Sequence, residues 1–347
     1  MPLTLKDTGE IKMCLGCTCF RDQEGALCSS ARAHIKRMME AHERMFGSKP
    51  IKRATSPLAS GDHPELDDAE LLGPEDTAKC QSLIGALQWA VSLGRADIAT
   101  AVMTMSSFRA LPREGHLERV KRIYGCLRRM DQDLIRINTD EPDYSDLPDP
   151  GYDWTRSVYG EVYEVIPSDA PEPKGKRVTQ TSYVDANLMH CLMTGKSVTG
   201  CLHFLNKTLI DAYTKKQGTV ETATYSSEFV AARTCVEQAE DIRTTLRYLG
   251  VPVHSEVYLF GDNESVVTSS TIPHSALKKR HNILSCHRVR EAIASGVHKF
   301  THMLGEGNPA DVVSKHWGYQ QVWPVLRQLL FNPDGRHTAT SNPEEGE

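Results

Sequence analysis

The sequence predicts an α/β protein in which a mixed five-stranded sheet, with helices on both faces, follows a small, mostly helical region. Two observations support this fold class. From residue 176 to residue 321, strand and helix signals follow the order β-β-β-α-β-α-β-α, which is typical of a mixed sheet covered by helices. From residue 77 to residue 130, apolar residues recur at three- and four-residue steps, which is the spacing of amphipathic helices.

The composition limits the class of protein. The chain has 347 residues, enough for two domains of ordinary size. No apolar run approaches the length of a membrane span, and the N-terminus has no signal-peptide pattern, so we expect no membrane partner. Ten scattered cysteines favour free thiols in a reducing, intracellular compartment. Because the net charge is -5, nucleic-acid binding would have to depend on a local basic patch or on metal ions.

The first predicted unit covers residues 1–130. A cysteine-rich stretch and a turn at residues 22–25 precede a helix at residues 30–46. An extended loop rich in proline, glycine and acids then runs to residue 76. Three helices complete the unit, and the third, at residues 117–130, is apolar on one face and basic on the other.

The second predicted unit is an acidic, proline-rich linker at residues 131–175. Trp154, Tyr159 and Tyr163 indicate that part of this linker packs on a neighbouring element. At the other end of the chain, residues 322–347 are predicted to hold the end of a C-terminal helix and a disordered tail.

The third predicted unit, residues 176–321, contains the sheet. Its first three strands and the two later ones are expected at residues 178–186, 197–205, 208–216, 257–260 and 297–303. A long helix from residue 224 to residue 249 is ended by glycine and proline, and further helices are expected at residues 282–294 and 309–316.

Two aspartates follow apolar strands of this unit. Asp185 closes the first strand, and Asp262 comes directly after a strand whose apolar character suits burial on both faces. Parallel strands present ligands at their carboxyl ends, so the two side chains would share one crevice if these strands are neighbours. The alternatives are a plain strand end and a plain turn.

Two further acids begin helices. On the long helix, Glu228 lies four residues before Ala232 and so continues the stripe that faces the core, where an unpaired carboxylate costs several kcal/mol. A cation beside it would remove that penalty, although an acid in the first turn also suits the helix dipole. Asp311 follows Asn308 and Pro309, which together form a good helix start without any further role.

A set of clustered carboxylates cannot ionise fully without cations. Carboxylate oxygens are hard ligands that suit Mg²⁺ or Mn²⁺. Two such ions about 4 Å apart can activate a water and stabilise the leaving oxygen of a phosphodiester. The four acids therefore predict a two-metal nuclease centre.

At these residues the sequence resembles the ribonuclease H domain of copia-type retrotransposon polyproteins. The matching segments are Tyr183-Val184-Asp185-Ala186-Asn187, Lys215-Lys216-Gln217, Thr224 to Ala232, Gly261 to Val266, and Asn308 to Lys315. The resemblance implies a ribonuclease H-like fold and cleavage of the RNA strand of RNA–DNA hybrids. It also implies metal binding by Asp185, Glu228, Asp262 and Asp311.

The resemblance continues upstream, through Ser82 to Trp89, Gly94 to Ala99 and Pro112 to His116, and so covers nearly the whole chain. It implies that residues 1–130 are a remnant of the end of a reverse transcriptase, in a C-terminal polyprotein fragment, with other polyprotein parts as partners. The Tyr-x-Asp-Asp turn of the polymerase palm is missing, so we expect no polymerase activity. The position two after the first aspartate, often acidic in the family, is Asn187, and a catalytic-loop histidine has no clear equivalent, although His302 lies nearby.

A basic stretch before and within the helix at residues 282–294 is the best candidate for phosphate contact. It contains Lys278, Lys279, Arg280, His287 and Arg288. A merely solvated helix face is the alternative. For the chain as a whole, the alternatives to a hybrid nuclease are an inactive relic that binds nucleic acid weakly, and an integrase- or transposase-like nuclease, which fits less well because Glu228 comes second among the acids.

Overall fold

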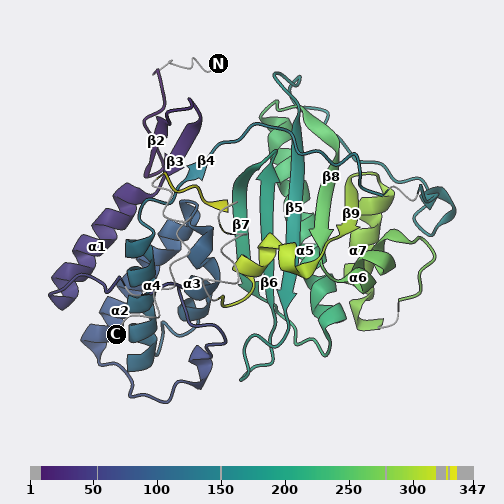
Figure 1. Cartoon of the computed structure of the whole chain (residues 1–347). Coiled ribbons are helices and arrows are strands. Elements are labelled where there is room, and N and C mark those ends of the chain that lie inside the picture. The colour runs from purple at the N-terminus through teal and green to yellow at the C-terminus, as the bar shows by residue number, and fades with distance from the viewer. Residues whose placement is uncertain are drawn as a thin grey trace.

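The computed structural model describes residues 9–52, 54–148, 151–277, 280–317, 326 and 329–333. Figure 1 shows the N-terminal helices packed beside one edge of a large twisted sheet. A separate small sheet lies above these helices. The predicted fold class, a mixed five-stranded sheet after a mostly helical region, is confirmed.

The small sheet was not predicted. Its order is β1 (Met13–Cys14), β2 (Cys17–Arg21), β3 (Leu27–Ser30) and β4 (Ile135–Arg136), and all its pairs are antiparallel. The expected turn at residues 22–25 joins β2 to β3, where Asp22 accepts hydrogen bonds from the amides of Glu24 and Ala26. The strands are short, and β4 comes from the expected linker, so local patterning carries little signal for them.

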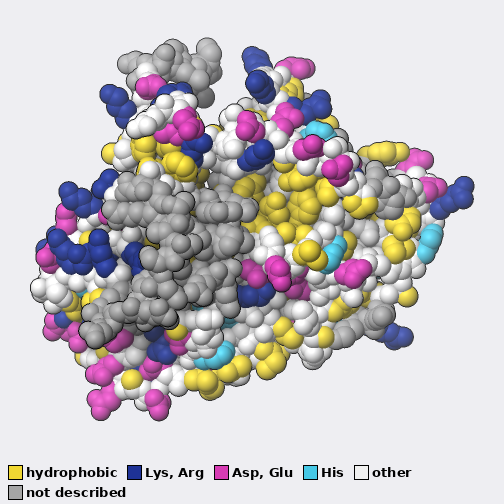
Figure 2. All heavy atoms as spheres, in the orientation of Figure 1, with side chains coloured by type: hydrophobic (Ala, Val, Ile, Leu, Met, Phe, Trp, Pro, Cys, Tyr) yellow, Lys and Arg dark blue, Asp and Glu magenta, His cyan; other side chains and the backbone are white. Residues whose placement is uncertain are grey.

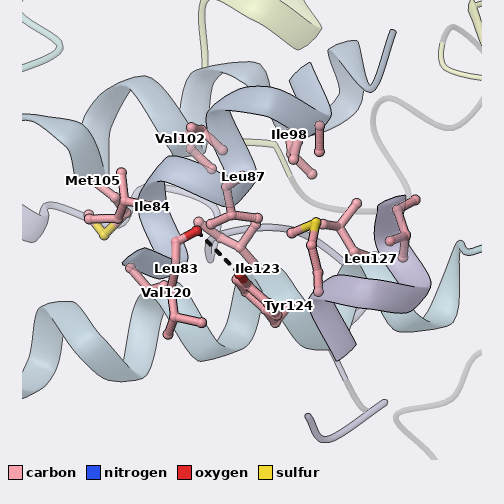
Figure 3. Close-up of a cluster of buried hydrophobic side chains, with 14 of the residues drawn as sticks. Leu83, Ile84, Leu87, Ile98, Val102, Met105, Val120, Ile123, Tyr124 and Leu127 are labelled. Carbon is pink, nitrogen blue, oxygen red and sulfur yellow. Dashed lines mark hydrogen bonds between the residues drawn. The ribbon is translucent and has the colours of Figure 1, made fainter. Parts of the chain in front are cut away.

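The predicted helices of the N-terminal region are present. They are α1 (Arg32–Phe46), α2 (Pro74–Ser92), α3 (Ala99–Ser106) and α4 (Glu114–Arg129), with short 3₁₀ turns η1 (Pro64–Leu66) and η2 (Ala96–Ile98). Figure 3 shows the core that they share, in which Leu83 and Leu87 of α2 meet Ile123 and Tyr124 of α4. The Tyr124 hydroxyl donates to the Leu83 carbonyl at 3.2 Å, which satisfies the one polar atom of that buried ring.

The large sheet has the order β7-β6-β5-β8-β9. Its strands are β5 (Val178–Asn187), β6 (Val198–Leu205), β7 (Thr208–Lys216), β8 (Val253–Gly261) and β9 (His298–His302). The first three pair antiparallel, while β5, β8 and β9 run parallel to one another. All five lie where the sequence predicts them, and β8 begins four residues earlier than expected.

Two sets of elements cover this sheet. One face packs on α5 (Thr224–Tyr248), α6 (Glu264–Thr271) and α7 (Ile283–Ala294). In Figure 1, α5 lies behind the sheet, and α6 and α7 lie to its right, beside β9. The other face packs on η6 (Pro309–Val313), which crosses in front of the sheet. The helix expected at residues 309–316 is therefore a 3₁₀ helix of five residues. Further short turns are η3 (Trp154–Arg156), η4 (Arg280–Asn282) and η5 (Gly305–Gly307).

The N-terminal region and the sheet share a hydrophobic core. Ala96, Ala99 and Met130 pack together with Leu202 and Val312. The segment between the two regions also packs on the sheet domain. The ring of Tyr144 lies tilted against that of Tyr258, the Tyr159 hydroxyl contacts His287, and Glu164 forms ion pairs with Arg243 and Arg247. The expected packing of Tyr159 is thus seen, whereas Tyr163 is 73% exposed. Among the described residues, none of the helices combines the length and apolar character of a membrane crossing.

Candidate metal centre

Strand pairing places the first two aspartates side by side. The last residues that pair between β5 and β8 are Val184 and Gly261. Asp185 follows Val184 in β5, and Asp262 follows Gly261 directly after the end of β8. Because β5 and β8 are parallel neighbours, both aspartates lie at the same carboxyl edge of the sheet. Asp185 is 1% exposed, which places its carboxylate in a low-dielectric surrounding.

Glu228 reaches the same place from α5. It is buried in the first turns of the helix, and Ala232 and Cys235 further along the same stripe are buried as well. The predicted continuation of the stripe by a carboxylate is confirmed, although Leu249 at its far end is 71% exposed. Ligand atoms of Asp185, Glu228 and Asp262 all lie within 4.8 Å of one another.

The proximity of these acids changes their proton affinities. Burial, together with the charges of Asp185 and Asp262, raises the pKa of Glu228 well above its ordinary value. Burial and the charge of Asp185 also raise the pKa of Asp262, and the nearby Lys315 opposes that change. Glu228 and Asp262 thus resist holding a charge at this place, which is the behaviour of a site in need of a cation.

Asp311 approaches the cluster from η6 and carries a counter-ion of its own. The Lys315 ammonium lies 2.5 Å from Asp311 Oδ1 and 3.2 Å from Asp185 Oδ1, so one cation bridges the two carboxylates. Burial and the charge of Asp185 nevertheless raise the pKa of Asp311 to about 6. Figure 2 shows acidic side chains and a basic side chain exposed together over the position of η6.

Three residues that contact or adjoin the acids were not among the predicted site residues. The Ser314 hydroxyl donates to Asp185 Oδ2, and Asn308 donates from Nδ2 to the Val184 carbonyl at 2.9 Å. Gly200 in β6 pairs with Asp185 in β5. A Cβ atom added at Gly200 would lie 2.9 Å from Ser314 Cβ. The glycine therefore lets η6 approach the sheet closely. Only the spacing of Asp311 and Lys315, four residues apart, could have indicated a pair from sequence alone.

The expected nucleic-acid residues have different surroundings. Lys278 and Lys279 lie outside the described residues, whereas Arg280 is exposed in η4. His287 is exposed, but its Nδ1 lies 2.5 Å from the Tyr159 hydroxyl. Arg288 is paired with Glu240 and Glu291.

One further arginine of this stretch is buried. Arg290 is 6% exposed and donates to the carbonyls of Ser269 and Ser275. At the other end of the site, His302 is exposed and its Nε2 lies 3.1 Å from the Asp262 carbonyl.

The donor set fits a hard divalent cation. Three carboxylates, two of them buried, converge without any histidine or cysteine in the group. Such all-oxygen sites suit Mg²⁺ or Mn²⁺. Asp185, Glu228 and Asp262 lie close enough together to hold such an ion, and Asp311 could join them if Lys315 moved aside.

Sequence comparison relates the chain to retrotransposon proteins. It is 25% identical over 319 residues to the retrovirus-related Pol polyprotein from transposon TNT 1-94 of Nicotiana tabacum, and 24% identical over 314 residues to that from transposon RE1 of Arabidopsis thaliana. Each match covers 90% of this chain but only 21% and 18% of those polyproteins. The predicted relationship to retrotransposon Pol polyproteins is confirmed, and the chain spans about a fifth of their length. No family model matches the chain.

Solved structures matched by this chain include ribonucleases H. RNase H1 from Halobacterium salinarum NRC-1 aligns with a TM-score of 0.30 and 15% identity, over 40% of this chain and 95% of that one. LC11-RNase H1 in complex with RNA/DNA hybrid aligns with a TM-score of 0.31 and 16% identity, over 39% of this chain and 94% of that one.

Proposed function

We propose that this chain is a divalent-metal-dependent nuclease of the ribonuclease H type, which cuts the RNA strand of RNA–DNA hybrids. The observation that carries the proposal is the convergence of Asp185, Glu228 and Asp262 within 4.8 Å, at the carboxyl edge of two parallel strands. The similarity to retrotransposon Pol polyproteins over 90% of the chain supports this choice of substrate.

The proposed metal ligands are Asp185, Glu228, Asp262 and Asp311. When bound, Mg²⁺ or Mn²⁺ ions, two in number, supply an activated water and stabilise the leaving oxygen of the phosphodiester. The protein's own contribution is to hold three carboxylates at one edge of the sheet and to keep Lys315 next to two of them. The ammonium can leave Asp311 when a second cation arrives, because it is 39% exposed and can reach solvent.

The hybrid is proposed to contact the basic segment before α7. Arg280 is exposed and has the charge needed for a phosphate contact, with Lys278 and Lys279 beside it in sequence. His281 lies 3.3 Å from Ser226 in the first turn of α5, two residues before Glu228, so this segment lies at the same end of α5 as the acids. His287 and Arg288 contribute after exchanging their present partners, and other polyprotein parts are proposed as partners.

The test is cleavage of a labelled RNA–DNA hybrid by the purified chain in Mg²⁺ or Mn²⁺, with Asp262→Asn as the matched control. We expect cuts in the RNA strand by the wild type and none by the variant. Equal products from both proteins would refute the proposal. A preference for duplex DNA over the hybrid would favour an integrase- or transposase-like nuclease instead.

A second candidate is an inactive relic that binds nucleic acid weakly. The observation that favours it is the pairing of Lys315 with both Asp185 and Asp311, which neutralises part of the cluster without any metal. The two candidates differ in a binding experiment. A relic takes up no Mn²⁺ at millimolar concentration, whereas the nuclease does so and loses this uptake in Glu228→Gln.

A further inference from the structure

A chain of buried polar contacts links the N-terminal helices to the first carboxylate. It starts at Thr104 of α3, whose hydroxyl lies 3.2 Å from His190 Nε2. His190 Nδ1 lies 3.0 Å from Asn187 Nδ2, and the same amide nitrogen lies 3.4 Å from the Ser314 carbonyl. The Ser314 hydroxyl then donates to Asp185. Thr104, His190 and Ser314 are buried, whereas Asn187 between them is half-buried.

One assignment of donors and acceptors fits this series of hydrogen bonds. The two N–H groups of Asn187 donate to the Ser314 carbonyl and to His190 Nδ1, so the imidazole proton is on Nε2 and is donated to Thr104. The Thr104 hydroxyl in turn donates to the Thr100 carbonyl at 2.9 Å. Burial lowers the pKa of His190 to about 3, in keeping with a neutral ring.

Helix α3 also contacts the segment that precedes Ser314. The Thr100 hydroxyl donates to the Val312 carbonyl at 3.2 Å, and Val312 and Val313 are buried in the core shared with Ala96 and Ala99. Helix α3 therefore contacts the segment that runs from Asp311 to Lys315 at two points, one direct and one through His190 and Asn187. Two of these contacts, Thr100 to Val312 and Thr104 to His190, join α3 directly to the sheet domain.

We propose that Thr104, His190 and Asn187 are positioning residues that set Ser314, and through it Asp185, for metal binding, so that the N-terminal helical region is a working part of the metal centre. This inference rests on the function proposed above. It also explains why residue 187 is an asparagine, although the copia-type polyproteins that this sequence resembles often have an acid at this position. A carboxylate could not donate to both His190 Nδ1 and the Ser314 carbonyl, whereas an amide can.

The test is Mn²⁺ binding to the metal-free full chain, measured by isothermal titration calorimetry well below the unfolding temperature. Thr104→Val removes the hydroxyl at almost constant volume, and Thr104→Ser retains it. Partners of metal ligands change metal affinity by roughly 10–100-fold when they are lost. We expect Thr104→Val and Asn187→Asp to bind Mn²⁺ about tenfold more weakly, and Thr104→Ser to bind within about threefold of wild type.

Thr245→Val is the matched control. Thr245 makes the same hydroxyl contact to the carbonyl four residues earlier, at 2.9 Å, but it lies on an exposed part of α5. The Thr245→Val variant should bind Mn²⁺ with the affinity of the wild type. Circular dichroism checks that every variant is folded at the temperature of the titration, and Asn187→Asp still tests the positioning role if Thr104→Val does not fold.

The outcomes separate the two proposals. Unchanged Mn²⁺ affinity in Thr104→Val and Asn187→Asp, with binding lost in Glu228→Gln, would overturn the positioning role and leave the metal centre intact. Equal weakening in Thr104→Val and Thr104→Ser would overturn it as well, because the hydroxyl would then be irrelevant. Absence of Mn²⁺ binding by the wild type would instead refute the proposed function.

Discussion

At the scale of single residues, the centre combines groups that destabilise one another when they are charged. Glu228 is buried beside Asp185 and Asp262, and its pKa is raised by burial first and by those two charges next. A carboxylate kept in such a place without a cation is a cost to the fold, because its ionised form loses water and gains like charges. The arrangement therefore favours a role in binding over a role in stability.

The substitution Glu228→Gln should stabilise the metal-free protein. Since the folded-state pKa of Glu228 lies above its unfolded value, the native state binds the extra proton, and stability falls as the pH rises from about 4.5 through the folded-state pKa. The substitution Glu228→Gln removes the charge and therefore this loss of stability. We expect a gain of about 1–3 kcal/mol in the free energy of unfolding at pH 8, measured by urea denaturation in EDTA.

The pH series provides the control for this gain. The gain in stability should shrink as the pH is lowered through 4.5, because below that value the wild-type carboxyl is protonated in both the folded and the unfolded state. Saturating Mn²⁺ should reverse the order of stability, because only the wild type keeps its full ligand set. A destabilised Glu228→Gln protein at pH 8 without metal would contradict the raised pKa.

The Lys315 ammonium is expected to compete with metal ions. Burial alone would lower its pKa, but the charges of Asp185 and Asp311 outweigh burial and raise it, so the group stays protonated. In Lys315→Gln the two carboxylates lose this counter-charge. We expect Mn²⁺ to bind roughly fivefold more tightly, since a partly exposed ion pair is worth about 1 kcal/mol. The metal-free variant should also unfold at a lower temperature.

Calorimetric titration and thermal unfolding check these two effects together. Lys207→Gln is the control, because that lysine lies at the β6–β7 turn, away from the cluster. Weaker Mn²⁺ binding by Lys315→Gln would show that the ammonium orders the carboxylates for the metal instead of competing with it.

At the scale of elements, the contact between β6 and η6 is close because Gly200 has no side chain. A Cβ atom there would lie 2.9 Å from Ser314 Cβ and from the Val313 carbonyl carbon, and 3.0 Å from the Ala310 carbonyl oxygen. Two of these three atoms belong to the backbone of the segment that carries Asp311 and Ser314. An added methyl group must therefore move the whole segment.

The substitution Gly200→Ala tests this contact. Overpacking of this kind costs about 1–3 kcal/mol, and the displaced segment should weaken Mn²⁺ binding as well. Gly218→Ala is the matched control, because nothing lies within 4 Å of a Cβ atom at that exposed turn. Thermal unfolding and calorimetry measure the two effects, and wild-type behaviour of Gly200→Ala in both would show that η6 adapts freely.

Patterning predicted some elements much better than others. The five strands of the large sheet and α5 have a clear period of two or of about 3.6, and they lie within a few residues of their expected places. The strands of the small sheet are two to five residues long, too short to show a period, and β4 pairs with β3 across more than a hundred residues. The last expected helix has a good N-terminal signal, but its Asn308 cap begins a 3₁₀ turn.

At the scale of the whole molecule, the two regions form one structure. The shared core joins Ala96, Ala99 and Met130 to the front face of the large sheet, and α3 contacts η6 through Thr100. A buried ion pair between Arg95 and Asp97 lies in the same part of the chain, and Arg95 also donates to the Met130 carbonyl. Unfolding of either region would expose this common surface.

We therefore expect a single cooperative unfolding transition. In a variant whose three other tryptophans are replaced by phenylalanine, the fluorescence of Trp89 in α2 reports on the N-terminal region, and circular dichroism at the β-sheet wavelength reports on the large sheet. The two midpoints should coincide within about 2 °C, and Mn²⁺ should raise both by the same amount, because coincident transitions are the mark of two-state unfolding. Two separate transitions, with only the second shifted by Mn²⁺, would show that the N-terminal region folds apart from the metal centre.

The sequence by itself determined the order of the elements, the five strands of the large sheet and the presence of carboxylates where strands end and helices begin. These features follow from local periodicity and residue type, which act within a few residues along the chain. Only the tertiary structure decided that β5 and β8 pair in a register that brings Asp185 beside Asp262. It also decided that Lys315 bridges Asp185 and Asp311, and that Thr104 reaches the centre through His190. These contacts join residues far apart in the chain, and their geometry depends on how whole elements pack.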